Sequence, residues 1–184
     1  MDAMRRDQAE LGVRNLLMAL GENPDREGLR ETPRRVRAFL DGFCSPEPFA
    51  FTTFENEGMS EMVVEAGIEF FSLCEHHMLP FFGEAVVAYV PGERIAGLSK
   101  LARAVRHCAV GFQTQERIAK TVADMLEEKL RPLGVGVVLR ARHLCMEMRG
   151  VQAHGVHTTT SQLRGVLFEK PEARAEFLAL ARGL

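Results

Sequence analysis

The stretch EMVVEAGIEFFSLCEHHMLPFFGEAVVAYV, residues 61–90, predicts two β-strands joined by a turn that carries metal-ligand side chains. In its first part, apolar residues stand at positions 62, 64, 66, 68 and 70, the period-2 alternation of a strand. Residues 81–90 form the second strand, and Pro91-Gly92 ends it in a turn. Cys74-Glu75-His76-His77 lies between the two strands, so we expect the rest of the chain to be organised around this turn.

The part of the chain that follows predicts two helices and two further strands. Ser99 is expected to cap a helix from Lys100 to about Ala109, and a longer helix runs from about Gln113 to Leu130. A third strand is expected over residues 135–149, and a fourth over 162–168 after a polar Gly/Thr-rich loop. A C-terminal helix starts at Pro171.

From Glu61 onward the predicted order is β-β-α-α-β-β, an α+β fold with an antiparallel sheet and helices on one face. Such a sheet leaves its edges and its opposite face uncovered. Pairing with further copies of the chain is one way to close the edges, so we expect a homo-oligomer.

The N-terminal part predicts a pair of helices, over residues 7–20 and from Thr32-Pro33 to about residue 43, with Thr32 as N-cap. Residues 44–60 are expected to form an irregular linker that packs by its phenylalanines. We therefore divide the chain into an N-terminal helical region, 1–60, and a catalytic domain, 61–184.

Composition limits the kinds of partner. The 184 residues are 46% hydrophobic and carry a net charge of −2, which does not favour general binding of nucleic acid or of anionic membrane. No apolar stretch approaches the length of a transmembrane helix, and the N-terminus has no apolar signal region. We expect a cytoplasmic protein whose cysteines are thiols or metal ligands and not disulfides.

Two short blocks hold five of the ten Cys and His residues, an arrangement that indicates a metal site. Cys74 and His77 are spaced C-x-x-H, which suits a tight turn. On a continuous strand, His143 and Cys145 would face the same way. Cys74, His77 and Cys145 would then be three protein ligands for Zn²⁺ with a fourth position left for water, as in catalytic zinc sites. His76 and His143 would be free for proton transfer. The alternative is a set of ordinary core thiols.

Cations at the start of the predicted helix near Ser99 suggest a phosphate site. Lys100 and Arg103 lie one turn apart beside free backbone N–H groups, although an exposed charged face would look the same. Arg149 is a candidate third cation. His154 and His157 are expected to be exposed to solvent, and Cys44 and Cys108 to be structural thiols.

Gln115 and Glu116 open the longer helix. A carboxylate there can accept two parallel hydrogen bonds from the N1–H and N2–H₂ edge of a guanine. Taken alone, the simpler explanation is that Glu116 favours the positive end of the helix dipole.

Taken together, the motifs resemble those of the zinc-dependent GTP cyclohydrolase I family. The segments that carry the resemblance are SLCEHHMLPFFG (72–83), GLSKLAR (97–103), QTQER (113–117) and HLCMEMRG (143–150). It extends over most of the chain, from about Gly28 to Leu178. It implies a tunnelling fold, assembled as a decamer of two pentamers with active sites between subunits. It also implies conversion of GTP and water to 7,8-dihydroneopterin triphosphate and formate, the first step of folate and pterin biosynthesis.

The resemblance also implies roles for individual residues. Cys74, His77 and Cys145 match the zinc ligands, and His76 and His143 match the histidines of proton transfer. Gln115 and Glu116 match the pair that anchors the purine. The remaining matches are the ribose and triphosphate contacts, namely Ser99, Lys100, Arg103 and Arg149. Ser99 and Gln115 are also expected to be catalytic residues, together with the two histidines.

Two other functions are kept open by the residues themselves. One is a related tunnelling-fold enzyme acting on another pterin or a deazapurine, which would not need the three cations together. The other is a non-catalytic zinc-stabilised binding module, which would close the metal site with a fourth protein ligand, either His76 or His143.

Overall fold

A computed structural model describes residues 3–182, which divide into two compact units. The first unit ends at Pro46 and contains α1 (Ala3–Ala19) and α2 (Thr32–Phe43), the predicted helical pair. Helix α2 already includes Thr32, its N-cap is Glu31 and no side chain caps it, so the predicted capping role of Thr32 is wrong. The functional division into 1–60 and 61–184 stays a prediction.

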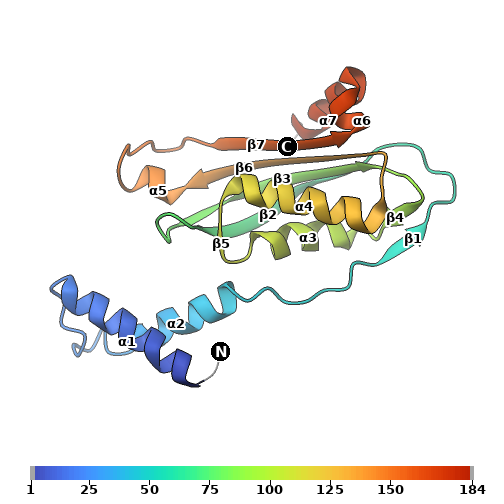
Figure 1. The fold of residues 1–184 in the computed structure, drawn as a ribbon. Coiled ribbons are helices and arrows are strands. Elements are labelled where there is room, and N and C mark those ends of the chain that lie inside the picture. The colour runs from blue at the N-terminus through green and yellow to red at the C-terminus, as the bar shows by residue number, and fades with distance from the viewer. Residues whose placement is uncertain (1–2, 183–184) are drawn as a thin grey trace. The chain divides into compact units, whose positions relative to one another are not determined.

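The second unit, from Glu47 onward, is built on a five-stranded sheet in the order β5-β2-β3-β6-β7 (Figure 1). The antiparallel strands are β2 (Val63–Cys74), β3 (Pro80–Val90), β6 (Gly134–His143) and β7 (Thr158–Gly165). The short β5 (Phe112–Gln113) runs parallel to β2 beside Cys74. The predicted α+β fold with an antiparallel sheet is confirmed at this level.

Two helices cover one face of the sheet, as predicted, and the other face is partly covered as well. Helices α3 (Ser99–Ala109) and α4 (Gln115–Leu130) lie along one face and form the main core with alternate residues of β3, Ala85, Val87 and Tyr89 (Figure 1). On the other face, Val86 and Ala88 pack against α6 (Val166–Glu169) and α7 (Pro171–Arg182). The expectation of an uncovered second face is therefore wrong at this end of the sheet.

Four local predictions differ from the structure. The fourth strand, predicted over residues 162–168, is β7 (Thr158–Gly165), and the residues that follow it form α6. The third strand ends at His143, and Cys145 lies on the single-turn helix α5 (Leu144–Glu147), so the two do not share a strand face. The linker contains β1 (Thr53–Glu55), which pairs with β4 (Arg94–Ala96) in a separate two-stranded sheet. Leu98, not Ser99, is the N-cap of α3.

In the described residues, no helix has both the length and the apolarity to cross a membrane.

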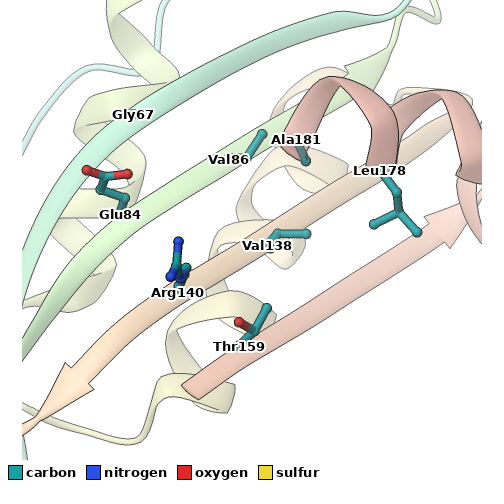
Figure 2. Close-up of a pocket in the computed structure, with 8 residues that line it drawn as sticks. All are labelled: Gly67, Glu84, Val86, Val138, Arg140, Thr159, Leu178 and Ala181. Atoms are coloured by element: carbon teal, nitrogen blue, oxygen red, sulfur yellow. The ribbon is translucent and has the colours of Figure 1, made fainter. Parts of the chain in front are cut away.

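A cavity of about 320 Å³ lies on the second face, between the sheet and α7 (Figure 2). Glu84 and Arg140 point into it from β3 and β6, and Leu178 and Ala181 approach it from α7. Neither Cys nor His lines it, so it is separate from the Cys/His cluster of the predicted metal site.

Gly83 permits the close approach of β3 to β6 next to that cluster. A Cβ at position 83 would overlap the carbonyl oxygen of Arg140 and lie 2.6 Å from Cα of Ala141. We predict that Gly83→Ala lowers the free energy of unfolding by about 3 kcal/mol, because two paired backbones must separate. Urea denaturation measures this change.

Gly42→Ala is the control, since nothing lies within 4 Å of a Cβ at that helical position and its φ is not positive. It is expected to leave stability unchanged or to raise it slightly. Equal stability of the Gly83→Ala and wild-type proteins would contradict the close packing of β3 and β6.

Candidate metal centre and its pocket

The turn after β2 brings Cys74 and His77 together. The N–H groups of His77 and Met78 both donate to the carbonyl oxygen of Cys74, at 3.3 and 2.8 Å, and the N–H of Cys74 donates to Leu79 at 2.8 Å. Met78 has φ +56°, the left-handed conformation that lets so tight a turn return the chain into β3. The C-x-x-H spacing thus forms the turn that the sequence predicted.

Cys145 reaches the same place from α5. The register of β3 and β6 sets Phe81 opposite His143, which brings the start of α5 beside the turn. A bidentate ion pair between Arg142 and Glu147, at 2.8 and 2.6 Å, holds α5 against the end of β6. This guanidinium also lowers the pKa of the Glu147 carboxyl.

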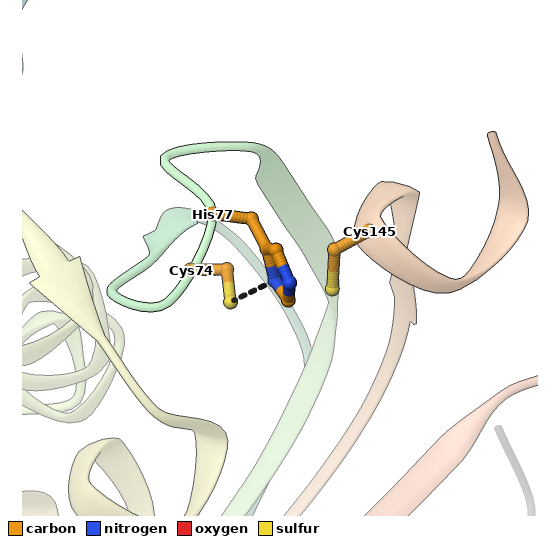
Figure 3. A group of neighbouring side chains, drawn as sticks. All are labelled: Cys74, His77 and Cys145. Atoms are coloured by element: carbon orange, nitrogen blue, oxygen red, sulfur yellow. Dashed lines mark hydrogen bonds between the residues drawn. The ribbon is translucent and has the colours of Figure 1, made fainter. Parts of the chain in front are cut away.

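The ligand atoms of Cys74, His77 and Cys145 all lie within 4.8 Å of one another (Figure 3). Cys74 Sγ lies 3.8 Å from His77 Nδ1. In a tetrahedral zinc site with metal–ligand bonds of about 2.0 to 2.3 Å, neighbouring ligand atoms lie roughly 3.5 to 3.8 Å from each other. Two sulfur atoms and one imidazole nitrogen also suit a borderline-soft ion. The group could therefore hold a metal.

Metal binding at this group has to displace protons. Burial raises the pKa of the Cys145 thiol, and the neighbouring Cys74 raises it further. Because a thiolate is the ligand form, metal affinity should fall as the pH is lowered.

A small pocket of about 150 Å³ opens beside the ligand group. Most of the predicted site residues line it, together with three polar or aromatic neighbours to which the sequence assigned no role. Its lining consists of Cys74, His76, His77, Phe81, Gln113, Thr114, Gln115, Glu116, His143 and Cys145.

His143 is half-buried in this pocket and held on two sides. Its Nε2 lies 2.8 Å from Oε1 of Gln115, and its ring stacks on Phe81 with centroids 4.7 Å apart and planes inclined by 5°. Burial lowers the pKa of the imidazole, and the carboxylate of Glu116 acts in the opposite direction.

His76 and Arg149 lie on the exposed side. His76 Nδ1 is 3.8 Å from Cys74 Sγ, and the adjacent Glu75 pairs with Arg117 of α4 at 2.7 Å, which ties the turn to that helix. Arg149 donates to Nε2 of His77 at 2.7 Å. The side chain of Glu116 is exposed at the start of α4, while Gln115 beside it is buried.

Ser99, Lys100 and Arg103 do not line this pocket. They belong to the first turns of α3, whereas the last residue of that helix, Ala109, accepts a hydrogen bond from Ser72, two residues before Cys74. With a rise of 1.5 Å per residue, the two ends of α3 are roughly 15 Å apart. Within one chain Ser99, Lys100 and Arg103 are therefore separated from the predicted metal site, whereas Arg149 lies beside it.

The remaining Cys and His predictions concern residues away from the pocket. His154 and His157 are exposed, as expected. Cys108 lies in the main core, where burial raises the pKa of its thiol to about 12, and Cys44 belongs to the first unit.

Three supports of the site were not predicted from the sequence: Phe81 under His143, the Arg142–Glu147 pair, and the threonines of β7 that hold Gln115. Only Phe81 had a usable signal, because a strand that pairs with the His143 strand must place a side chain next to the imidazole.

Comparisons with known proteins agree with these motifs. The family model described as GTP cyclohydrolase I matches residues 9–182. The chain is 49% identical to GTP cyclohydrolase 1 of Aquifex aeolicus, over 99% of this chain and 100% of the relative. It is 50% identical to GTP cyclohydrolase 1 of Deinococcus radiodurans, over 93% of this chain and 82% of the relative. Among solved structures, the apo archaeosine synthase QueF-Like is 14% identical to the chain, over 60% of this chain and 97% of its own, with a TM-score of 0.47.

Proposed function

Because the chain belongs to the GTP cyclohydrolase I family, we propose that its Cys74–His77–Cys145 pocket carries out the reaction of that family. The chain is a hydrolase that converts GTP and water to 7,8-dihydroneopterin triphosphate and formate, in folate and pterin biosynthesis. The observation that carries the assignment of the site is the convergence of three metal-ligand atoms within 4.8 Å in a pocket that also contains His143 and Glu116.

We assign Zn²⁺ to Cys74, His77 and Cys145. The donor set and the 3.8 Å separation of Cys74 Sγ and His77 Nδ1 support this ion. When bound, zinc supplies a Lewis acid that makes water a usable nucleophile near neutral pH. A metal on Nδ1 leaves Nε2 of neutral His77 with its proton, so Arg149 could no longer donate to it and would become available for another acceptor.

His76 and His143 are the proposed proton-transfer groups. Opening the guanine imidazole ring requires a proton for the departing nitrogen, and the ribose must later open and rearrange, which again needs an acid and a base. Both imidazoles line the pocket beside the ligand group, which supports the assignment.

Glu116 is the proposed purine anchor. Its exposed carboxylate at the mouth of the pocket can accept two parallel hydrogen bonds from guanine N1–H and N2–H₂. The family resemblance assigns the preceding residue, Gln115, to the same role, but its amide is buried.

The triphosphate is assigned to Ser99, Lys100, Arg103 and Arg149. Arg149 is already beside His77, whereas the other three lie at the far end of α3. A complete substrate site therefore requires the start of α3 from a second copy of the chain. This separation supports active sites between subunits, as the family resemblance implies.

Two further features support a closed homo-oligomer with a tunnelling fold, proposed here as a decamer of two pentamers. In the described chain most of β7 has β6 as its only neighbour, so one long edge is open for pairing with another copy. Within the first unit, helices α1 and α2 expose large apolar side chains, including Leu11, Leu16 and Phe39. Such surfaces are typical of interfaces. The cytoplasmic location stays a prediction.

The phosphate assignment predicts a selective effect of Arg103→Ala. Loss of one charge-assisted hydrogen bond to the triphosphate should raise KM for GTP about 10- to 100-fold, because such bonds contribute roughly 1.5–3 kcal/mol. Steady-state formate release as a function of GTP concentration measures the change.

Arg106→Ala is the matched control, because Arg106 is an exposed arginine three residues further along the same helix. Its removal changes the charge of α3 equally and should leave KM within about twofold, as expected for an exposed arginine without a specific phosphate contact. Equal effects of both substitutions would exclude a specific role for Arg103.

Substrate comparison tests the proposed function directly. Purified protein is incubated with GTP, ATP or guanosine, and formate and pterin fluorescence after oxidation are followed. We expect both products from GTP, none from ATP, which lacks the N1–H and N2–H₂ edge, and little from guanosine. Turnover of a non-phosphorylated pterin or deazapurine, with GTP untouched, would instead favour the related enzyme.

A further inference from the structure

The side chain of Gln115 is buried, with 2% of the residue exposed, and both ends of its amide are engaged inside the protein. Its Nε2 faces three oxygen atoms: the carbonyls of Leu139 and Thr158, at 3.0 and 3.1 Å, and the hydroxyl of Thr160, at 3.0 Å. Its Oε1 faces Nε2 of His143 at 2.8 Å. Both polar atoms of this amide already have partners inside the protein, and the side chain is closed off from solvent.

The surroundings fix which way the amide points. If the amide were turned over, its oxygen would face two backbone carbonyls, which can only accept hydrogen bonds. Those carbonyls would lose the donor that Gln115 provides. Each buried polar group left without a hydrogen bond would cost about 1–3 kcal/mol of stability. The orientation with Oε1 toward His143 is therefore strongly favoured.

This orientation determines the tautomer of His143. An amide oxygen only accepts, so Nε2 of His143 has to carry the proton and donate it to Gln115. Phe81, which is 1% exposed, stacks on the imidazole at 4.7 Å and prevents the ring from rotating away. Nδ1 is then the nitrogen that remains to exchange a proton.

We propose that Gln115 is a positioning residue that acts through His143. It holds the imidazole as the Nε2–H tautomer, with Phe81 fixing the plane of the ring, so that Nδ1 is the atom that takes and returns the proton. Gln115 does not contact the purine, and Glu116 alone supplies the purine anchor of this pair. The inference rests on the proposed role of His143 in proton transfer.

The test separates kcat from KM in Gln115→Met, which keeps the length of the side chain but cannot hydrogen-bond to His143. We expect kcat to fall about 100-fold, within the usual range for general acid–base catalysis, with KM for GTP within about twofold. A purine anchor predicts the opposite, a raised KM with kcat largely kept. Gln115→Asn is measured alongside, because it keeps an amide but is too short to span from β7 to His143, and it should show the same loss.

A double-mutant cycle with His143→Ala identifies the route of the effect. If Gln115 acts through His143, adding Gln115→Met to His143→Ala causes no further loss of single-turnover formate release. Calorimetric GTP binding, measured in the same background, should also be unchanged. Thr160→Val is measured for comparison. It removes one of three acceptors of Gln115 and leaves the bond to His143 in place, so its loss of kcat should be well below that of Gln115→Met.

Multiplicative losses in the cycle, or weaker GTP binding by the double variant, would overturn this inference while the wild-type protein remained active on GTP. An inactive wild-type protein would instead refute the proposed function.

Discussion

Cys145→Ser is expected to abolish both metal retention and turnover. A serine hydroxyl stays protonated at neutral pH and cannot replace the thiolate, which leaves only Cys74 and His77 from the group within 4.8 Å. Since a bound metal ion contributes several kcal/mol to the transition state, turnover should fall about 1,000-fold or more. Elemental analysis for zinc and formate release from GTP measure the two effects.

Cys44→Ser is the matched control, because Cys44 is a half-buried free thiol outside the ligand group. It should keep one metal per chain and full activity. If Cys145→Ser retained normal turnover after treatment with a chelator, the assignment of Cys145 as a ligand would be refuted.

The second large effect is expected for His143→Ala. This substitution removes a proposed acid–base group but none of the three ligand atoms, so the protein should bind metal normally and lose turnover about 100- to 10,000-fold. Metal content and single-turnover formate release are measured on the same preparation.

His154→Ala provides the comparison, since His154 is an exposed histidine outside the pocket and should be dispensable. Loss of metal from His143→Ala would make His143 a ligand and would favour a closed, structural site. Unchanged turnover would remove it from the mechanism.

The sequence predicted the metal group because its ligands lie in local patterns. Cys74 and His77 share one turn, and strand periodicity on both sides of that turn predicted the β2–β3 pair. The position of Cys145 could not be derived in the same way. The pattern of the sequence predicts a strand through residue 149, whereas in the structure a helical turn begins directly after His143 and is accompanied by the Arg142–Glu147 ion pair.

The surroundings of Gln115 could not be predicted from the sequence either. The pair Gln115-Glu116 looks uniformly polar in the sequence, yet the first side chain is buried between β6 and β7 and the second is exposed. This difference depends on how α4 lies on strands that are 24 to 45 residues away in sequence. The same applies to Ser99, Lys100 and Arg103, because only the direction of α3 shows that they are far from the metal group of their own chain.

The most direct test of this account is GTP turnover with and without a strong zinc chelator, followed by return of one equivalent of zinc per chain. Formate and pterin fluorescence are recorded together, with circular dichroism to monitor the fold. We predict that chelation stops both products while the fold stays intact, and that zinc restores both. Undiminished turnover by protein shown to be free of metal would contradict the account, and unfolding on chelation would indicate a structural metal site.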